Sequence, residues 1–121
     1  MDVRKDRLRQ RTREFAVRIV RLTGALPKAG PTRNLAEQLL RSGTSVGAHY
    51  AESCRSKSKA DFANKITGAM QELEETIYWI YVIENSGIVK AERLSQLKGE
   101  MSELMAIFVT MVKHTRSDST P

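Results

Sequence analysis

The chain has 121 residues and a mass of 13.6 kDa, which suits one compact domain and leaves little room for a second. Hydrophobic residues make up 40% and charged residues 28%, proportions that exclude wholesale disorder, and no apolar run approaches the roughly 20 residues that would cross a bilayer. The formal net charge of +6 and the pI near 9.8 favour an anionic partner.

The cellular compartment is indicated by two features. The only cysteine, Cys54, cannot form an internal disulfide. The N-terminus carries no basic start followed by an apolar run and a small-residue cleavage site. We therefore expect the protein to reside in the cytoplasm.

The first predicted helix ends near residue 26. Its apolar residues recur at helical steps, namely Leu8, Phe15, Ile19, Leu22 and Leu26. This spacing predicts a helix with one buried face. Leu26-Pro27 and Gly30-Pro31 end it, because proline cannot continue the backbone hydrogen-bond ladder and restricts the residue before it.

The second predicted helix starts near Thr32, the expected N-cap, and runs to Ser53. Its middle, residues 42–51, is rich in small side chains, and each glycine costs about 1 kcal/mol of helix propensity relative to alanine. Close approach of a neighbouring helix would compensate, since small side chains permit contact at a shorter distance. That neighbour is either another helix of the same chain or a second subunit.

The third predicted helix has Ser58 as its N-cap, and Asp61 in the first turn complements the helix dipole. Apolar residues then keep helical spacing from Phe62 to Ile80, as far as the stop signal at residues 85–87. The C-terminal half of this helix is apolar nearly all round, which is more than one bundle core needs.

The fourth predicted helix begins near Lys90 and has the clearest heptad pattern, with Leu94, Leu97, Met101, Leu104, Phe108 and Met111. Further apolar residues beside this stripe widen its apolar surface. After His114 the sequence offers nothing to bury. We therefore expect a single bundle domain over residues 1–115 and a flexible C-terminal tail over residues 116–121.

Four such helices joined by short connections predict an all-α fold, an antiparallel up-down-up-down four-helix bundle. The excess apolar area on the third and fourth helices predicts a homo-oligomer, since contiguous exposed apolar patches usually mark interfaces. The candidate interface consists of Tyr78, Trp79, Tyr81, Val82, Met105, Val109 and Val112.

Residues that support catalysis or metal binding are few. His49 and Cys54 are five residues apart and would point in different directions from one helix. Di-metal bundles use a glutamate followed three residues later by a histidine, whereas His49 and Glu52 stand in the reverse order. The sequence has no glycine-rich phosphate loop, zinc spacing or dinucleotide fingerprint. We therefore expect no enzyme activity, no catalytic residue, no metal and no cofactor.

Basic residues carry the main functional signal. Arginines of the first segment fall at helical steps that suit a phosphate backbone, and a second cluster lies between the second and third helices. The candidate nucleic-acid-binding residues are Arg4, Arg7, Arg11, Arg18, Arg21, Arg41, Arg55, Lys57 and Lys59. Aromatic and amide readers are not interleaved, which favours backbone over base contacts. Solvation alone accounts for any one of these residues.

The acidic cluster of Glu72, Glu74 and Glu75 is either solvated or an inter-subunit partner for these arginines.

Three runs of the sequence resemble one known family. They are RSGTSVGAHY at residues 41–50, CRSKSKADF at 54–62 and ELEETIYW at 72–79, and Leu26-Pro27 agrees with them. Over roughly residues 15–112 the chain resembles the four-helix bundle family of 23S rRNA intervening-sequence proteins, which includes the accessory variability proteins of diversity-generating retroelements. His49 stands where the family usually has asparagine, and the sequence leaves both branches open.

The resemblance implies a left-handed bundle that assembles as a ring, a homopentamer in known relatives, without catalysis. In the retroelement branch the ring is basic, binds nucleic acid and partners a reverse transcriptase, whereas the intervening-sequence branch has no established activity. We therefore predict a non-enzymatic, homo-oligomeric bundle that binds the backbone of RNA or DNA as an accessory or scaffold, with a reverse transcriptase as candidate partner and no membrane partner. The alternative is a structural protein-protein interaction module without a nucleic-acid role.

Overall fold

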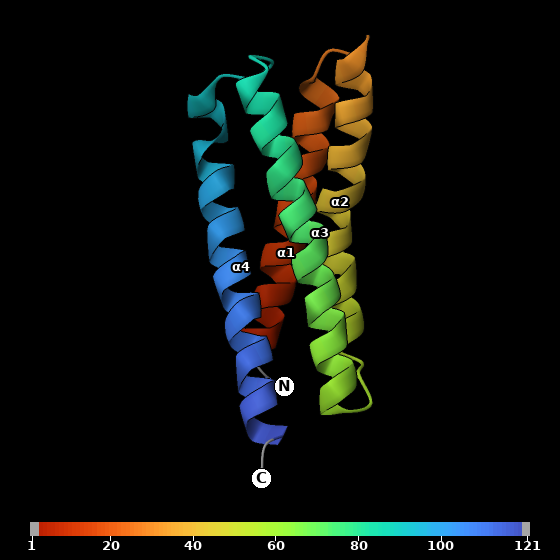
Figure 1. Ribbon diagram of the computed structural model, residues 1–121, viewed down its shortest axis with the longest axis vertical. Helices are drawn as coiled ribbons and strands as arrows, with labels where there is room; N and C mark the ends of the chain where they lie inside the picture. The colour runs from red at the N-terminus through yellow and green to blue at the C-terminus, as the bar shows by residue number, and fades with distance from the viewer. Residues whose placement is uncertain (1–2, 120–121) are drawn as a thin grey trace.

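Four long helices make up almost all of the chain in a computed structural model, which describes residues 3–119. They are α1 (Val3–Ala25), α2 (Pro31–Ser53), α3 (Lys59–Asn85) and α4 (Ala91–Ser119). Consecutive helices run in opposite directions, and the α2–α3 connection lies at the same end of the bundle as both chain ends (Figure 1). No strand occurs within the described residues. The predicted all-α, up-down-up-down four-helix bundle is confirmed.

The two ends of α3 follow the predicted signals. The Ser58 hydroxyl accepts a hydrogen bond from the Asp61 amide at 3.0 Å, which satisfies one of the unpaired amides of the first turn. At the other end Gly87 adopts a φ of 73°, and the Ile88 amide donates to the Ile83 carbonyl at 3.3 Å. This is a Schellman motif, in which glycine takes the left-handed conformation without steric cost.

Two helix boundaries differ from the prediction. Gly30, with a φ of 62°, occupies the N-cap position of α2, so Thr32 lies inside the first turn and is not the cap. Pro31 follows at the first helical position. This position suits proline, because an amide hydrogen there would have no partner within the helix. Helix α4 continues to Ser119, beyond the predicted start of the tail at residue 116. The flexibility of residues 116–121 stays a prediction, and residues 120–121 lie outside the described chain.

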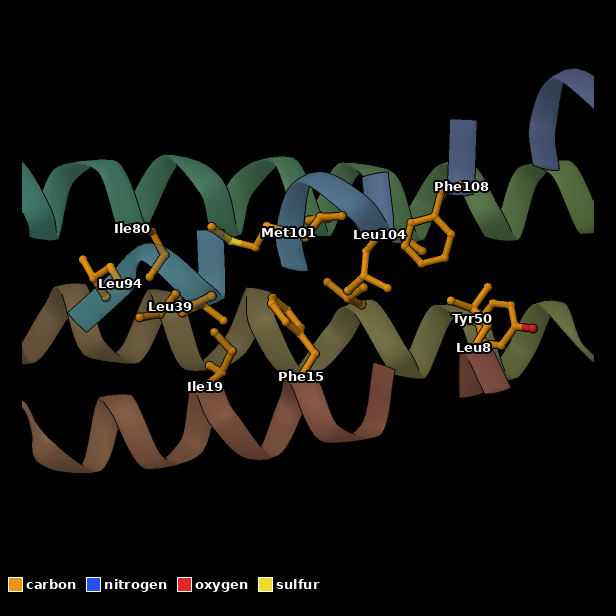
Figure 2. Packing of buried hydrophobic residues seen from close by; sticks show 14 of the residues in the cluster. Leu8, Phe15, Ile19, Leu39, Tyr50, Ile80, Leu94, Met101, Leu104 and Phe108 are labelled. Carbon is orange, nitrogen blue, oxygen red and sulfur yellow. The ribbon is translucent and has the colours of Figure 1, made fainter. Parts of the chain in front are cut away.

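The predicted apolar stripes meet along the bundle axis, where Figure 2 shows labelled side chains from all four helices pointing toward one another. Tyr50 and Phe108 pack with ring centroids 6.3 Å apart near one end of this core. The apolar residues predicted for the stripes of α1 and α4 are all buried except Leu22 and Met111, which are half-buried. The fully buried residues of greatest volume are Tyr50, Phe15, Phe108, Ile19, Leu39, Ile66, Leu73, Ile80, Ile83, Leu94, Leu104 and Val46.

Two of the small residues of α2, Gly43 and Gly47, lie against α1. A Cβ atom built on Gly43 would come within 2.7 Å of Ile19 Cγ2, and one on Gly47 within 3.3 Å of Thr12. These two glycines therefore let the α1 and α2 backbones approach more closely than side chains would permit. Of the two neighbours left open by the sequence, the structure has a helix of the same chain.

Packing is uneven around the bundle. Helix α2 packs extensively on both α1 and α3, and α4 packs mainly on α3, whereas α1 and α4 meet over only a short region. The edge between the first and last helices is therefore the least closely packed side of the bundle.

Candidate nucleic-acid interface

Three segments that are distant in sequence bring positive charge to one end of the bundle: the start of α1, the α2–α3 turn and the end of α4 (Figure 1). The Tyr50 hydroxyl of α2 donates a hydrogen bond to the Lys5 carbonyl of α1 at 3.2 Å, and one groove is lined by both Arg4 and His114. We call this surface the basic pole and define it as Arg4, Lys5, Arg7, Arg9, Arg55, Lys57, Lys59, Lys113 and Arg116.

The basic pole is largely open to solvent. All of its side chains are exposed except Arg9, which is half-buried. Arg9 lies 3.9 Å from Asp6, and its pKa is raised chiefly by a side-chain hydrogen bond with Cys54. The nearby Asp61 carboxylate accepts a hydrogen bond from the Lys57 backbone amide at 3.4 Å. This carboxylate therefore interacts within the α2–α3 turn itself. The pole keeps an excess of cations that face solvent.

Arg11, a member of the predicted stripe, joins α1 to α4. Its Nη2 lies 2.5 Å from Glu100 Oε1 and 3.2 Å from Glu103 Oε2, and its Nε donates to Glu100 Oε2 at 3.2 Å. The Arg11 side chain is only 29% exposed and that of Glu100 only 19%. Arg11 is therefore held in an ion pair within the chain, which reduces its availability to phosphates.

Arg41 is held in the same way between α2 and α3. Its guanidinium donates to Glu72 at 3.2 Å and also to Glu75. The Trp79 indole donates to Glu75 at 3.1 Å, and this bond, together with Arg41, holds the pKa of Glu75 below its usual value. Two carboxylates of the predicted acidic cluster thus pair with an arginine of their own chain, whereas Glu74 is exposed.

The structure gathers only part of the predicted basic set. Arg18 and Arg21 lie on α1 about 20 Å or more from Arg4, at 1.5 Å per residue, and so stand apart from the pole. The predicted residues that come together are Arg4, Arg7, Arg55, Lys57 and Lys59. Lys5, Arg9, Lys113 and Arg116 also belong to the pole but were not among the predicted binding residues. Lys113 and Arg116 could have been found from the predicted up-down topology, because that topology places the end of the fourth helix beside the start of the first.

The predicted oligomer interface does not form one exposed face. Tyr78 and Tyr81 are 57% and 64% exposed on α3, and Ile77, which was not singled out, is 37% exposed beside them. Val112 is only 6% exposed, because it follows Phe108 by one turn on the inner face of α4, and its side chain is already covered within the chain. The other predicted members are half-buried, namely Trp79, Val82, Met105 and Val109.

Potential catalytic and metal-binding side chains lie apart. His49 packs over Gly68 of α3, where an added Cβ atom would lie 2.9 Å from its Nδ1, while Cys54 is half-buried after the end of α2. Within residues 3–119 no three histidine, cysteine, aspartate or glutamate side chains gather as metal ligands would. Nor does any helix in that range have the length and apolar composition that spanning a bilayer requires.

Comparison with known proteins finds a match over most of the chain. Residues 4–110 match the profile of the 23S rRNA-intervening sequence protein family. The chain belongs to this family. The chain is also similar to a Bacteroides thetaiotaomicron VPI-5482 protein with unknown function from the S23 ribosomal protein family, whose crystal structure was determined at 1.70 Å resolution. The two share 31% sequence identity and a TM-score of 0.81, over 88% of this chain and 98% of the other. No curated protein matches the chain.

The family match extends the region of likeness at the N-terminal side. It begins at Arg4, whereas the sequence motifs supported a resemblance only from about residue 15. The matched region thus includes the part of α1 that supplies the first cations of the basic pole.

Proposed function

We propose that this intervening-sequence family protein is a non-enzymatic, homo-oligomeric bundle that binds the phosphate backbone of nucleic acid through the basic pole. The proposal is carried by one observation, the convergence of exposed lysines and arginines from three separate segments at one end of the bundle. Duplex DNA presents one negative charge per about 1.7 Å of helix axis, so a compact cationic surface displaces several counterions at once.

Backbone binding fits the pole better than base reading does. Its cations lie at helix ends and in a turn, and the α2–α3 turn presents them beside serine residues rather than beside amide side chains that would read base edges. Lysine and arginine at such positions position a phosphate backbone without specifying its sequence. The ligand is therefore expected to be selected by charge density and shape.

Binding of labelled RNA and DNA oligonucleotides across a salt series tests the proposal. A triple variant, R7Q/K57Q/K59Q, removes three exposed charges of the pole. Each lost phosphate contact lowers the slope of log affinity against log salt by about 0.9 on duplex DNA, so the slope should fall by about 2 to 3. Parallel RNA and DNA arms identify the preferred nucleic acid.

The matched control removes three exposed cations at the other end of the bundle, in the variant K28Q/K90Q/R93Q. Its net charge changes by the same amount, so any effect of overall charge appears in both variants. Equal losses in the two variants would refute the pole as the binding surface. Absence of binding at low salt would refute nucleic-acid binding altogether and favour the protein-interaction alternative.

Homo-oligomerisation in this proposal uses the exposed Tyr78 and Tyr81 side chains of α3. Large exposed aromatic side chains beside apolar ones are typical of interfaces. Light scattering should give a mass well above 13.6 kDa for the parent chain, and the pentamer of the resembled relatives is the expected assembly. The variant Y78S/Y81S should lower that mass, whereas V17S/V20S, which alters comparably exposed valines on α1, should leave it unchanged. A monomeric parent at micromolar concentration would contradict the proposal.

The proposal also includes a cytoplasmic location and a reverse transcriptase as protein partner. Support for the partner comes only from the resemblance of residues 41–50, 54–62 and 72–79 to a family that includes retroelement accessory proteins. The gene neighbourhood distinguishes the two branches. A reverse-transcriptase gene with a template repeat supports the partner, and a position inside a 23S rRNA gene without such a gene speaks against it.

A further inference from the structure

A groove of about 810 Å³ lies between the start of α1 and the end of α4, on the least closely packed side of the bundle. The ion pair between Arg11 and Glu100 joins the two helices next to the groove. From Arg11 the groove continues toward the chain ends, and Leu8 and Phe62 contribute apolar surface to it. It is thus an open channel in which part of the core remains accessible.

The two walls of the groove differ in chemistry. The α1 wall carries the exposed cations Arg4, Lys5 and Arg7. The α4 wall presents a strip of apolar side chains that includes the half-buried Ile107 and Met111, and its polar lining residues are Thr110, His114 and Thr115. A phosphate backbone gains nothing from the apolar strip, so this part of the lining goes beyond what the basic pole needs. An occupant that is apolar on one side and acidic on the adjoining side satisfies both walls.

The dimensions suit a helix. The lining residues span 4–11 on α1 and 106–115 on α4, which correspond to about 12 and 15 Å at 1.5 Å per residue. Two to three turns of an added helix have that length, enough for apolar anchors at positions i, i+3, i+4 and i+7. Methionine adapts its shape to different partners, and the planar fork of an arginine matches a carboxylate.

We propose that this groove docks an acidic amphipathic helix of a partner protein, with the apolar face of the helix against Ile107 and Met111 and its carboxylates toward Arg7. The inference does not depend on nucleic-acid binding, although Arg7 belongs to both surfaces. If both ligands bind, they therefore compete for this arginine.

The test uses a fluorescein-labelled, lactam-bridged helical peptide of about 14 residues, with leucines at the four anchor positions and glutamates along one flank. Fluorescence anisotropy measures its binding to the full chain. A second peptide keeps the same lactam bridge and has lysine in place of every other glutamate. The acidic peptide should bind with at least about fivefold higher affinity than the basic one, and it should shift the Met111 methyl resonance in NMR spectra.

Two charge reversals on α1 form a matched pair. Arg7 lines the groove and Arg13 does not, although both are exposed. R7E should weaken binding of the acidic peptide about fivefold or more and strengthen binding of the basic peptide, whereas R13E should change neither beyond its effect on net charge. On α4, I107E and the more exposed T110E should each weaken binding of the acidic peptide, and T110E covers the case in which I107E does not fold.

The proposal is overturned if the acidic peptide does not bind at millimolar concentration, or if the basic peptide binds equally well. Equal losses from R7E and R13E would also overturn it, because they would reflect overall charge rather than the groove. If I107E and T110E abolish oligonucleotide binding but leave peptide binding intact, the groove is a nucleic-acid site and the protein-docking proposal fails.

Discussion

Substitution of Gly43 by alanine tests whether close packing of α1 on α2 explains the small residues of α2. The new Cβ atom would lie 2.7 Å from Ile19 Cγ2, 2.8 Å from Cγ1 and 3.2 Å from Cβ, and Ile19 is fully buried. Removal of glycine gains about 1 kcal/mol of helix propensity, whereas overpacking of a core costs about 1 to 3 kcal/mol. We expect G43A to lower the free energy of unfolding by about 1 kcal/mol.

Gly99 provides the matched control, because a Cβ atom there meets nothing within 4 Å in the middle of α4. G99A should therefore raise the free energy of unfolding by about 0.5 to 1 kcal/mol in urea titrations. In a double-mutant cycle, I19A should cost less in the G43A background than in the parent chain, because it removes both close Cγ atoms. A stabilising G43A would refute the packing argument. A G43A penalty that depends on protein concentration would place the contact between subunits instead.

Three further substitutions test individual contacts by urea unfolding. S58A removes the N-cap of α3 and should cost about 1 kcal/mol; no loss would contradict the capping role. R11A leaves the half-buried Glu100 without its bidentate partner and should cost about 1 kcal/mol, less at high salt, and a salt-independent loss would point to packing instead. The hydrogen bond from Trp79 lowers the pKa of Glu75, so the stabilisation by this carboxylate is fully present above about pH 4.3 and lost as pH falls through the folded pKa. E75Q should therefore be less stable than the parent at neutral pH, with a difference that shrinks at pH 3, and a constant difference would refute the assignment.

The helices were predictable because their signals are local. The heptad stripe of α4 and the capping serine of α3 act through residues within one or two turns, so a single sequence contains them in full. The predicted start of α2 was wrong for a similarly local reason. Pro31 is favoured at the first helical position, which makes Gly30 the N-cap and leaves Thr32 inside the first turn.

The candidate site was only partly predictable because it is assembled by tertiary structure. Arg11 and Arg7 look alike in sequence, yet one faces carboxylates of α4 and the other is exposed at the basic pole. Glu100, the partner of Arg11, is 89 residues away along the chain, and nothing near Arg11 in the sequence identifies it. Periodicity likewise assigns a helix its inner face but not the local separation of two helices, and the groove between α1 and α4 depends on that separation.

The arrangement of subunits in an oligomer decides how the positive charge of each chain is presented to nucleic acid. Arg11 and Arg41 pair with carboxylates along the length of the bundle, whereas the cations of the basic pole gather at one end and face solvent. If subunits are related by rotation about an axis parallel to their helices, every pole lies on the same face of the ring, and one nucleic-acid backbone can cross several poles. A two-fold axis perpendicular to the helices would instead place the poles at opposite ends. Strong multivalent binding to a single strand would therefore require a ring with parallel subunits, and an antiparallel dimer would bind two strands with the affinity of a single pole.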